Sequence, residues 1–311
     1  MGNSIELPYE GAGQSFCNLV GLLPGTNPAL APVLVGAHYD SVIPHPCADD
    51  NAAAVAIALQ VGRMLSEQER MERGVVIALF DAEEPPYFLG EQMGSNRFFA
   101  DHVLGRREIH AAVVMDLVGH DISVPAEILG SLAGAGQWAK QIPGLAGMDV
   151  SVPLLKNTVF ISGGESHVDL PVALERLGQP SGLRVMPTLN EYIGDMSDYA
   201  VFRRNGVPYW FLSCGRWAHY HMPTDTPDRL NYHKMAAIAS YVVDLVREAG
   251  RSPLAGRTGE ENVHDPIAME SAFVREALGV LYHPTMQWMG LEDVSTRRRM
   301  GAFVRKLEQM I

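Results

Sequence analysis

The stretch VLVGAHYDSVIPHPCADDNAAAVAIALQVGRMLSEQERMERGVVIALFDAEE, residues 33–84, decides the fold class. It opens with an apolar run that ends in His38 and Asp40, continues with a helical pattern, and closes with a second apolar run followed by Glu83 and Glu84. Short apolar runs bounded by polar residues are typical of buried strands. A strand, a helix and another strand in this order predict two parallel strands joined by a helix.

The same alternation continues along the chain. Residues 111–119 and 208–215 form two further apolar runs, and helical patterns begin near Ser95 and extend over residues 234–248. The first helix of the chain should present Val55, Ala58, Leu59, Gly62 and Leu65 on one face. Together these patterns predict an α/β domain with a mostly parallel central sheet covered on both faces. Residues 121–190 show little periodicity and are interpreted as loops and short elements over a cleft.

Composition excludes several classes of function. The 311 residues are 47% hydrophobic, which is too apolar for a disordered chain, and their formal net charge is −12, which argues against nucleic-acid binding. The run Arg297, Arg298 and Arg299 is too short to change this and is expected to be a solvated helix face. No apolar run reaches the roughly 18–20 residues of a membrane helix, and the start MGNSIELPYEGAGQ does not resemble a signal peptide. A cytoplasmic location is therefore the default expectation, and secretion would require a leader that has been removed.

Polar residues gather where the predicted strands end, which is where ligands bind in such sheets. His38 alone would more often be a core histidine, but Asp40 is suited to orient a metal-bound imidazole. Asp49 and Asp50 stand where a helix begins. Capping the start of a helix needs only one such residue. Because adjacent carboxylates repel one another, the pair indicates a nearby cation.

Three more places complete the set. Glu83 and Glu84 directly follow a strand, and on their own they could be solvated loop charges. Asp116 lies in the apolar run VVMDLVG, where a buried carboxylate needs a metal ion or a base as its partner. Tyr220 and His221 come shortly after the fourth apolar run. Histidine nitrogens and carboxylate oxygens in this combination are typical ligands of zinc.

At this point the chain resembles the di-zinc aminopeptidases related to bacterial leucyl aminopeptidases and to glutamate carboxypeptidase. The matching stretches occur in the family's order over about residues 15–248; they are AHYDS, ADDNAAA, FDAEEPPYFLGEQMGS, MDLVG, SDYAVFRRNGVP and YHMPTDTPDRL. The resemblance implies two zinc ions per chain. One would be held by His38 and Asp116, the other by Glu84 and His221, and Asp49 would bridge them.

The resemblance also implies roles beyond the ligands. Asp49 would be joined to Asp50 by a cis peptide bond, and Glu83 would be the general base. Tyr220 would steady the developing oxyanion, and two more carboxylates, those of Asp40 and Asp198, would support the ligands. Cys47 is expected to be a small buried hydrophobe and not a ligand.

The implied activity is hydrolysis of the N-terminal residue of peptides by a two-zinc-bound hydroxide, so the expected partner is a peptide with a free N-terminus. One alternative is a glutaminyl cyclase of the same fold, which uses one zinc and the same glutamate pair; its helix start typically reads TDSA, whereas this chain has ADDNAA. The other alternative, a catalytically inactive peptidase-like binding domain, is disfavoured because all five ligand types and the base are present. The side-chain preference stays open.

The resemblance assigns residues 1–250 to a zinc exopeptidase domain and leaves residues 251–311 as a helical C-terminal extension. The last helix of this extension carries an apolar stripe of Met300, Phe303, Val304, Leu307 and Ile311. An exposed stripe of this kind would be unusual in a soluble monomer, so its own domain or a second subunit should cover it. A homodimer contact is slightly favoured, because the family fold is complete by about Gly250.

Overall fold

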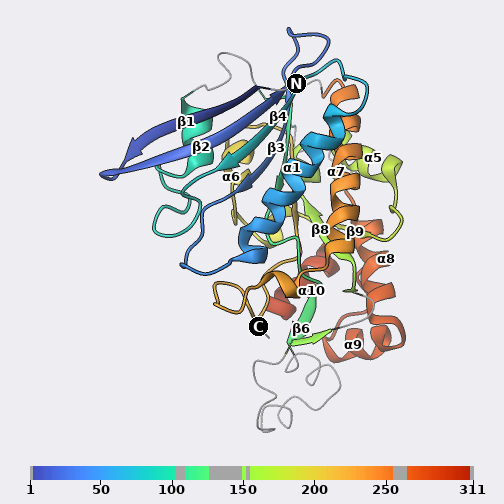
Figure 1. Ribbon diagram of the computed structural model, residues 1–311. Helices are drawn as coiled ribbons and strands as arrows, with labels where there is room; N and C mark the ends of the chain where they lie inside the picture. Colours follow the sequence, from blue (N-terminus) through green and yellow to red (C-terminus); the bar gives the residue numbers. More distant parts are fainter. Residues whose placement is uncertain (1–2, 102–108, 126–148, 152–154, 255–264, 309–311) are drawn as a thin grey trace.

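A mixed eight-stranded sheet forms the centre of the protein (Figure 1). The computed structural model describes residues 3–101, 109–125, 149–151, 155–254 and 265–308. Within these ranges the strand order is β1-β2-β4-β3-β5-β10-β8-β9. The strands are β1 (Asn3–Gly11), β2 (Gln14–Leu23), β3 (Val33–His38), β4 (Val75–Phe80), β5 (Ala111–Met115), β8 (Thr158–Ser162), β9 (Arg184–Pro187) and β10 (Tyr209–Ser213). A separate small sheet pairs β6 (Ser123–Pro125) with β7 (Asp149–Ser151).

The four central strands are parallel, as predicted. β3 pairs with β4 and β5, and β5 pairs with β10, all in parallel register. Antiparallel pairs flank this centre, because β2 pairs with both β1 and β4, and β8 pairs with β10. The predicted α/β class is confirmed. The parallel centre brings the carboxyl ends of β3, β4, β5 and β10 to the same edge of the sheet.

Helices cover both faces of the sheet. α1 (Ala53–Ser66), α5 (Asp169–Leu177) and α7 (Tyr232–Arg251) pack on one face, where Val33, Val35 and Ala37 of β3 point. α2 (Gly94–Ala100) and α6 (Tyr199–Arg204) pack on the other, which Leu34 joins. Neighbouring residues of a strand thus enter two separate hydrophobic cores, which explains why the central strands read as continuous apolar runs.

The predicted buried face of α1 was partly wrong. Its buried residues include Ile57, Ala58, Val61 and Leu65, whereas Leu59 is 56% exposed. The helix contains apolar residues on most of its circumference, so the spacing of these residues alone does not single out the face that packs on the sheet.

The interpretation of residues 121–190 as loops and short elements over a cleft was partly wrong, because some of these elements belong to the main sheet. Residues 158–187 supply β8, α5 and β9, which extend the main sheet beyond β10. β8 and β9 have only five and four residues. Runs this short, separated by Gly and Pro, carry little periodic signal. Residues 126–148 and 152–154 lie outside the described residues.

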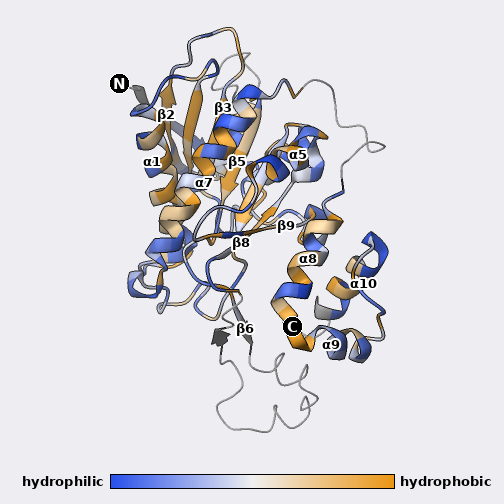
Figure 2. Ribbon diagram, turned by 90° about the vertical axis from the view of Figure 1, so that its right-hand side faces the viewer, coloured by the Kyte–Doolittle hydropathy of each residue, from blue (hydrophilic) through white to orange (hydrophobic). Residues whose placement is uncertain are grey.

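The C-terminal extension forms the predicted helices α8 (Ile267–Leu278), α9 (Tyr282–Trp288) and α10 (Arg297–Glu308). Figure 2 shows them as a group beside β9. Met300 and Phe303 are buried in a hydrophobic cluster of these helices, against which Met186 and Tyr192 of the main domain also pack. Covering this part of the stripe therefore does not require a second subunit. The side chain of Leu307 and all of Ile311 lie outside the described residues, and the division at residue 250 stays a prediction.

The arginine run of α10 is not a fully solvated face. Arg297 forms ion pairs with Asp265 and with the buried Glu270, and Arg299 pairs with Asp293. Only Arg298 of the three is exposed. Across the described ranges, no helix combines the length and the apolar character needed to cross a membrane.

Candidate metal centre

The sheet places four segments with metal-binding side chains at one edge. His38 is the last residue of β3, and Asp116 directly follows β5. Glu84 lies four residues after the end of β4, and His221 lies in the loop that follows β10. Because β3, β4, β5 and β10 are parallel neighbours, these residues meet at the carboxyl edge of the sheet, as the strand-end pattern predicts.

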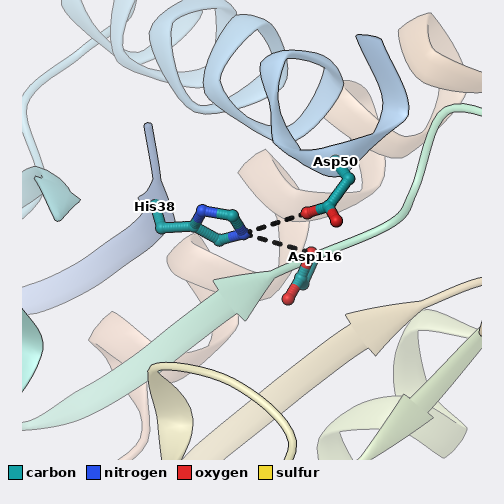
Figure 3. Close-up of side chains that lie close together, drawn as sticks. All are labelled: His38, Asp50 and Asp116. Atoms are coloured by element: carbon teal, nitrogen blue, oxygen red, sulfur yellow. Dashed lines mark ion pairs between the residues drawn. The ribbon is translucent and has the colours of Figure 1, made fainter. Parts of the chain in front are cut away.

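A first cluster consists of His38, Asp50 and Asp116 (Figure 3). His38 Nε2 lies 3.3 Å from Asp50 Oδ1 and 3.5 Å from Asp116 Oδ1. All three side chains are buried. One ligand atom from each residue lies within 4.8 Å of the others, so the three can surround a single cation.

A second cluster consists of Asp50, Glu84 and His221. His221 Nε2 lies 3.1 Å from Asp50 Oδ2 and 3.2 Å from Glu84 Oε2. Asp50 therefore belongs to both clusters and directs a different carboxylate oxygen toward each. A carboxylate in this position is suited to be shared by two cations.

The expectation that Asp49 bridges two ions needs correction, because Asp50, and not Asp49, belongs to both clusters. Asp49 belongs to neither cluster, and its Oδ1 accepts hydrogen bonds from the amides of Gly119 (2.6 Å) and His120 (3.0 Å). Its Oδ2 lies 2.6 Å from His120 Nδ1. The cis peptide bond likewise joins Asp50 to Asn51 and not Asp49 to Asp50.

The local backbone explains the shift by one residue. The two acids lie in the irregular turn η1 (Ala48–Ala52), which follows Cys47 in the left-handed region with φ 42°. Asp50 has φ −111° and ψ 80°, which is not helical, so Asp49 and Asp50 direct their side chains to opposite partners. Cys47 is buried and belongs to neither cluster. Its thiol lies 3.8 Å from the carbonyl of Ile43.

The donor atoms of both clusters fit metal ions. Five of their atoms are buried without a hydrogen-bond partner; they are His38 Nε2, Asp50 Oδ2, Asp116 Oδ1, Glu84 Oε1 and His221 Nε2. Buried polar atoms are normally paired, since leaving one unpaired costs roughly 1–3 kcal/mol. Imidazole nitrogens with carboxylate oxygens form a donor set that suits zinc. A pair of cations would satisfy these atoms together.

Crowded carboxylates raise one another's pKa. Burial, followed by the nearby charge of Asp50, raises the pKa of Glu84 to about 8. Burial also raises the pKa of Asp116, although the neighbouring His38 opposes this. Without a cation, the carboxyl group of Glu84 would therefore hold its proton near neutral pH, and a bound cation would reverse this preference.

Glu83 lies beside the clusters but in neither. Its Oε2 is 3.9 Å from His38 Nε2, and burial raises the pKa of its carboxyl group well above the usual value. Asp40 holds this segment, because its two oxygens accept hydrogen bonds from the amides of Glu83 (3.1 Å) and Glu84 (3.0 Å). Asp40 Oδ1 also lies 3.4 Å from His38 Nδ1, so the expected support for the imidazole is present.

Tyr220 and Asp198 are the remaining residues singled out from the sequence. The ring of Tyr220 stacks on that of His221, with 3.7 Å between the centroids. Burial raises the pKa of the Tyr220 hydroxyl to about 12, so it keeps its proton at neutral pH. Asp198 is fully buried where α6 begins, and burial raises its pKa to about 7.

Sequence reasoning missed two residues that hold the site together. Asp225, in the quoted stretch YHMPTDTPDRL, accepts hydrogen bonds from the amides of Asp49 (2.9 Å) and Asp50 (3.1 Å). His120 follows the stretch MDLVG and pairs with Asp49. The signal for both was a polar residue beside a ligand-bearing stretch, but their partners are distant in the sequence and could not be inferred from it.

Comparison with known proteins agrees with this geometry. Residues 18–126 and 126–246 match the sequence model of Peptidase family M28. The chain is 28% identical over 230 residues to the uncharacterized protein YfbL of Escherichia coli (strain K12), covering 69% of this chain and 66% of YfbL.

Several solved structures share the fold. The LapA aminopeptidase of Legionella pneumophila superposes with a TM-score of 0.58 at 16% identity, covering 80% of this chain and 59% of LapA. BSAP, a zinc aminopeptidase from Bacillus subtilis, gives a TM-score of 0.54 at 19% identity, covering 82% of this chain and 54% of BSAP. At these identities the likeness shows the fold alone. The chain spans less than two thirds of the length of each of these three relatives.

Proposed function

Since the chain belongs to peptidase family M28, we propose that it is a zinc-dependent aminopeptidase that removes single residues from the free N-terminus of peptides. One observation carries the proposal: the two oxygens of Asp50 face two separate sets of ligands. This arrangement supports a centre for two metal ions, in which Asp50 takes the bridging role expected of Asp49.

Each ion would have its own pair of side chains besides Asp50. His38 and Asp116 would hold one ion, and Glu84 and His221 would hold the other. The unpaired buried atoms of these residues support the assignment. When bound, zinc polarises a carbonyl group and lowers the pKa of a bound water from 15.7 to about 7.

Glu83 is the general base of the proposed reaction. It accepts a proton from the attacking water, and it returns this proton to the amine that leaves when the peptide bond breaks. Its buried carboxylate lies 3.9 Å from His38 Nε2 but belongs to neither cluster, so it stays free to exchange a proton beside the metal ions. The protonated hydroxyl of Tyr220 can donate a hydrogen bond to the developing oxyanion.

The charge of the site favours an exopeptidase. Four carboxyl groups, those of Asp50, Glu83, Glu84 and Asp116, lie around the same edge of the sheet. With Asp50, Glu84 and Asp116 bound to the metal ions, Glu83 is the carboxylate left to attract a free α-amine of a substrate, whereas an internal peptide segment has no cation to offer. The site thus supports action at the N-terminus and not within a chain.

A metal count with an activity panel tests the proposal. The purified protein should bind two zinc ions and release the anilide from aminoacyl-anilides, and Asp50→Ala should lose tight binding of both ions because it removes a ligand from each cluster. No anilide release by zinc-saturated protein would contradict the proposal. Saturation by a single zinc ion, with conversion of glutaminyl peptides to pyroglutamyl peptides and no hydrolysis, would establish the cyclase instead.

A further inference from the structure

The buried pair Asp49 and His120 adjoins the proposed centre through Asp50, the neighbour of Asp49, and takes no part in the chemistry described above. Asp49 is fully buried and His120 is 1% exposed. The carboxylate receives three hydrogen bonds, two from the backbone amides of Gly119 and His120 and one from His120 Nδ1 at 2.6 Å. Such a fully paired buried acid fixes the segments that it joins.

This pair connects three segments that each carry a proposed ligand. Asp49 is the neighbour of Asp50, and His120 lies four residues after Asp116 on the segment that leaves β5. The imidazole of His120 stacks on the indole of Trp217, with 4.5 Å between centroids and 14° between planes. Trp217 lies four residues before His221 and accepts a hydrogen bond from the amide of Tyr220 through its carbonyl.

Asp49 sets the orientation of the His120 ring. Among the described residues, His120 Nε2 has no hydrogen-bond partner, so the bond from Nδ1 to Asp49 is the polar contact that orients the imidazole. Lys234 donates a hydrogen bond to the His120 carbonyl from α7, which holds the backbone but not the ring. Loss of the Nδ1 bond would therefore free the ring and loosen the link between the three segments.

Gly119 is closely packed between Asp49 and the start of α1. A Cβ atom on Gly119 would lie 2.8 Å from Asp49 Oδ1 and 2.8 Å from the Cβ of Ala53, the first residue of α1. Real Cβ atoms do not approach so closely, so this glycine permits the carboxylate to reach the two amides. The close fit indicates that the distance between the turn of Asp50 and the segment of Asp116 is set at this point.

We propose that Asp49 and His120 are positioning residues: their hydrogen bond holds Asp50, Asp116 and His221 at the separation that two metal ions require. The inference rests on the proposed function, because it assigns the pair a role toward the same centre. Groups that orient ligands typically contribute about 10–100-fold to metal affinity. A pair that merely stabilised the fold would change the melting temperature but not the affinity of the folded protein for zinc.

Two substitutions at His120 separate the contribution of its hydrogen bond to zinc affinity from the contribution of its ring stacking. His120→Asn keeps an NH group near the position of Nδ1, and His120→Leu removes it, while both lose the stacking on Trp217. Zinc affinity is measured by competition with a chromophoric chelator, and the stability of the metal-free proteins by thermal unfolding. We expect His120→Leu to bind zinc about 10–100-fold more weakly than the wild type and His120→Asn to stay within about threefold.

A control and a second variant distinguish a specific loss of zinc affinity from a general loss of stability. His110 lies at the opposite end of β5, where its Nε2 contacts the carbonyls of Ala249 (3.1 Å) and Ser252 (3.0 Å). His110→Leu should lower the melting temperature without weakening zinc binding. Asp49→Asn keeps the shape but turns an NH₂ group toward His120 or toward the two amides. It should weaken zinc binding about tenfold even if His120→Leu does not fold.

The outcomes separate this inference from the proposed function. Zinc binding by His120→Leu and Asp49→Asn at wild-type affinity would overturn the positioning role and leave the proposed function standing. Equal weakening by His120→Asn and His120→Leu would also overturn it, because the stacking and not the hydrogen bond would then matter. Wild-type protein that binds no zinc would overturn both.

Discussion

Glu83→Gln is the sharpest test of the proposed reaction. Glu83 is 4% exposed, and glutamine has nearly the same shape, so the buried packing is kept. Its Oε2 lies 3.9 Å from His38 Nε2 but belongs to neither ligand cluster, so the two zinc ions should stay bound. The amide cannot accept the proton of the attacking water. We expect kcat to fall by about 10²–10⁴-fold, the usual contribution of a general base, which corresponds to about 2.7–5.4 kcal/mol at 1.36 kcal/mol per tenfold.

The assay combines steady-state kinetics on an aminoacyl-anilide with a zinc count on the same preparation. Glu84→Gln is the matched control, because the adjacent residue has the same chemistry but contributes Oε2 to the second cluster, 3.2 Å from His221 Nε2. Glu84→Gln should lose zinc affinity together with activity. The reasoning is refuted if Glu83→Gln keeps full activity, and also if it loses zinc as Glu84→Gln does, since Glu83 would then be a ligand.

Three further predictions follow from the same structure. Zinc occupancy and activity should fall together as the pH falls, because the ligands must be deprotonated to bind and burial raises the pKa of one of them, Glu84, to about 8. Full activity at pH 4.5, with full zinc occupancy measured after dialysis, would contradict this. A peptide with an acetylated N-terminus should be cleaved far more slowly than its free-amine twin, whereas equal rates by chromatography would defeat the aminopeptidase assignment. Arg297→Ala should destabilise the protein by roughly 2–4 kcal/mol in denaturant unfolding, because it leaves the buried Glu270 unpaired, while exposed Arg298→Ala should stay within about 0.5 kcal/mol.

The centre of the fold could be predicted because its signal is local. β3, β4, β5 and β10 are buried on both faces, so each appears in the sequence as an apolar run that ends in polar residues. Parallel pairing of these runs then predicts that their polar ends meet, and His38, Glu84, Asp116 and His221 do so. The cluster could therefore be predicted from the residues at the strand ends, without knowledge of contacts between residues distant in the sequence.

The edges of the fold could not be predicted in the same way. β1 and β2 form a hairpin with partly exposed residues, and β8 and β9 are short strands in a segment rich in Gly and Pro. β2 and β8 join the centre of the sheet through β4 and β10, which lie far away in the sequence, so what makes them strands is the sheet edge to which they add. Propensity over four or five residues is too weak a signal to detect such strands.

The choice between Asp49 and Asp50 shows where reasoning from residue types ends. Both are carboxylates at the start of a helix, and each has the chemistry of a zinc ligand. What separates them is the direction that the turn gives each side chain, and the turn is held by Asp225, 176 residues from Asp49, and by His120, 71 residues away. These partners exist only after the sheet has formed. Two adjacent acids in such a turn therefore need not share one role: one can face the metal ions while its neighbour, turned the other way, ties the turn to the segments that carry the remaining ligands.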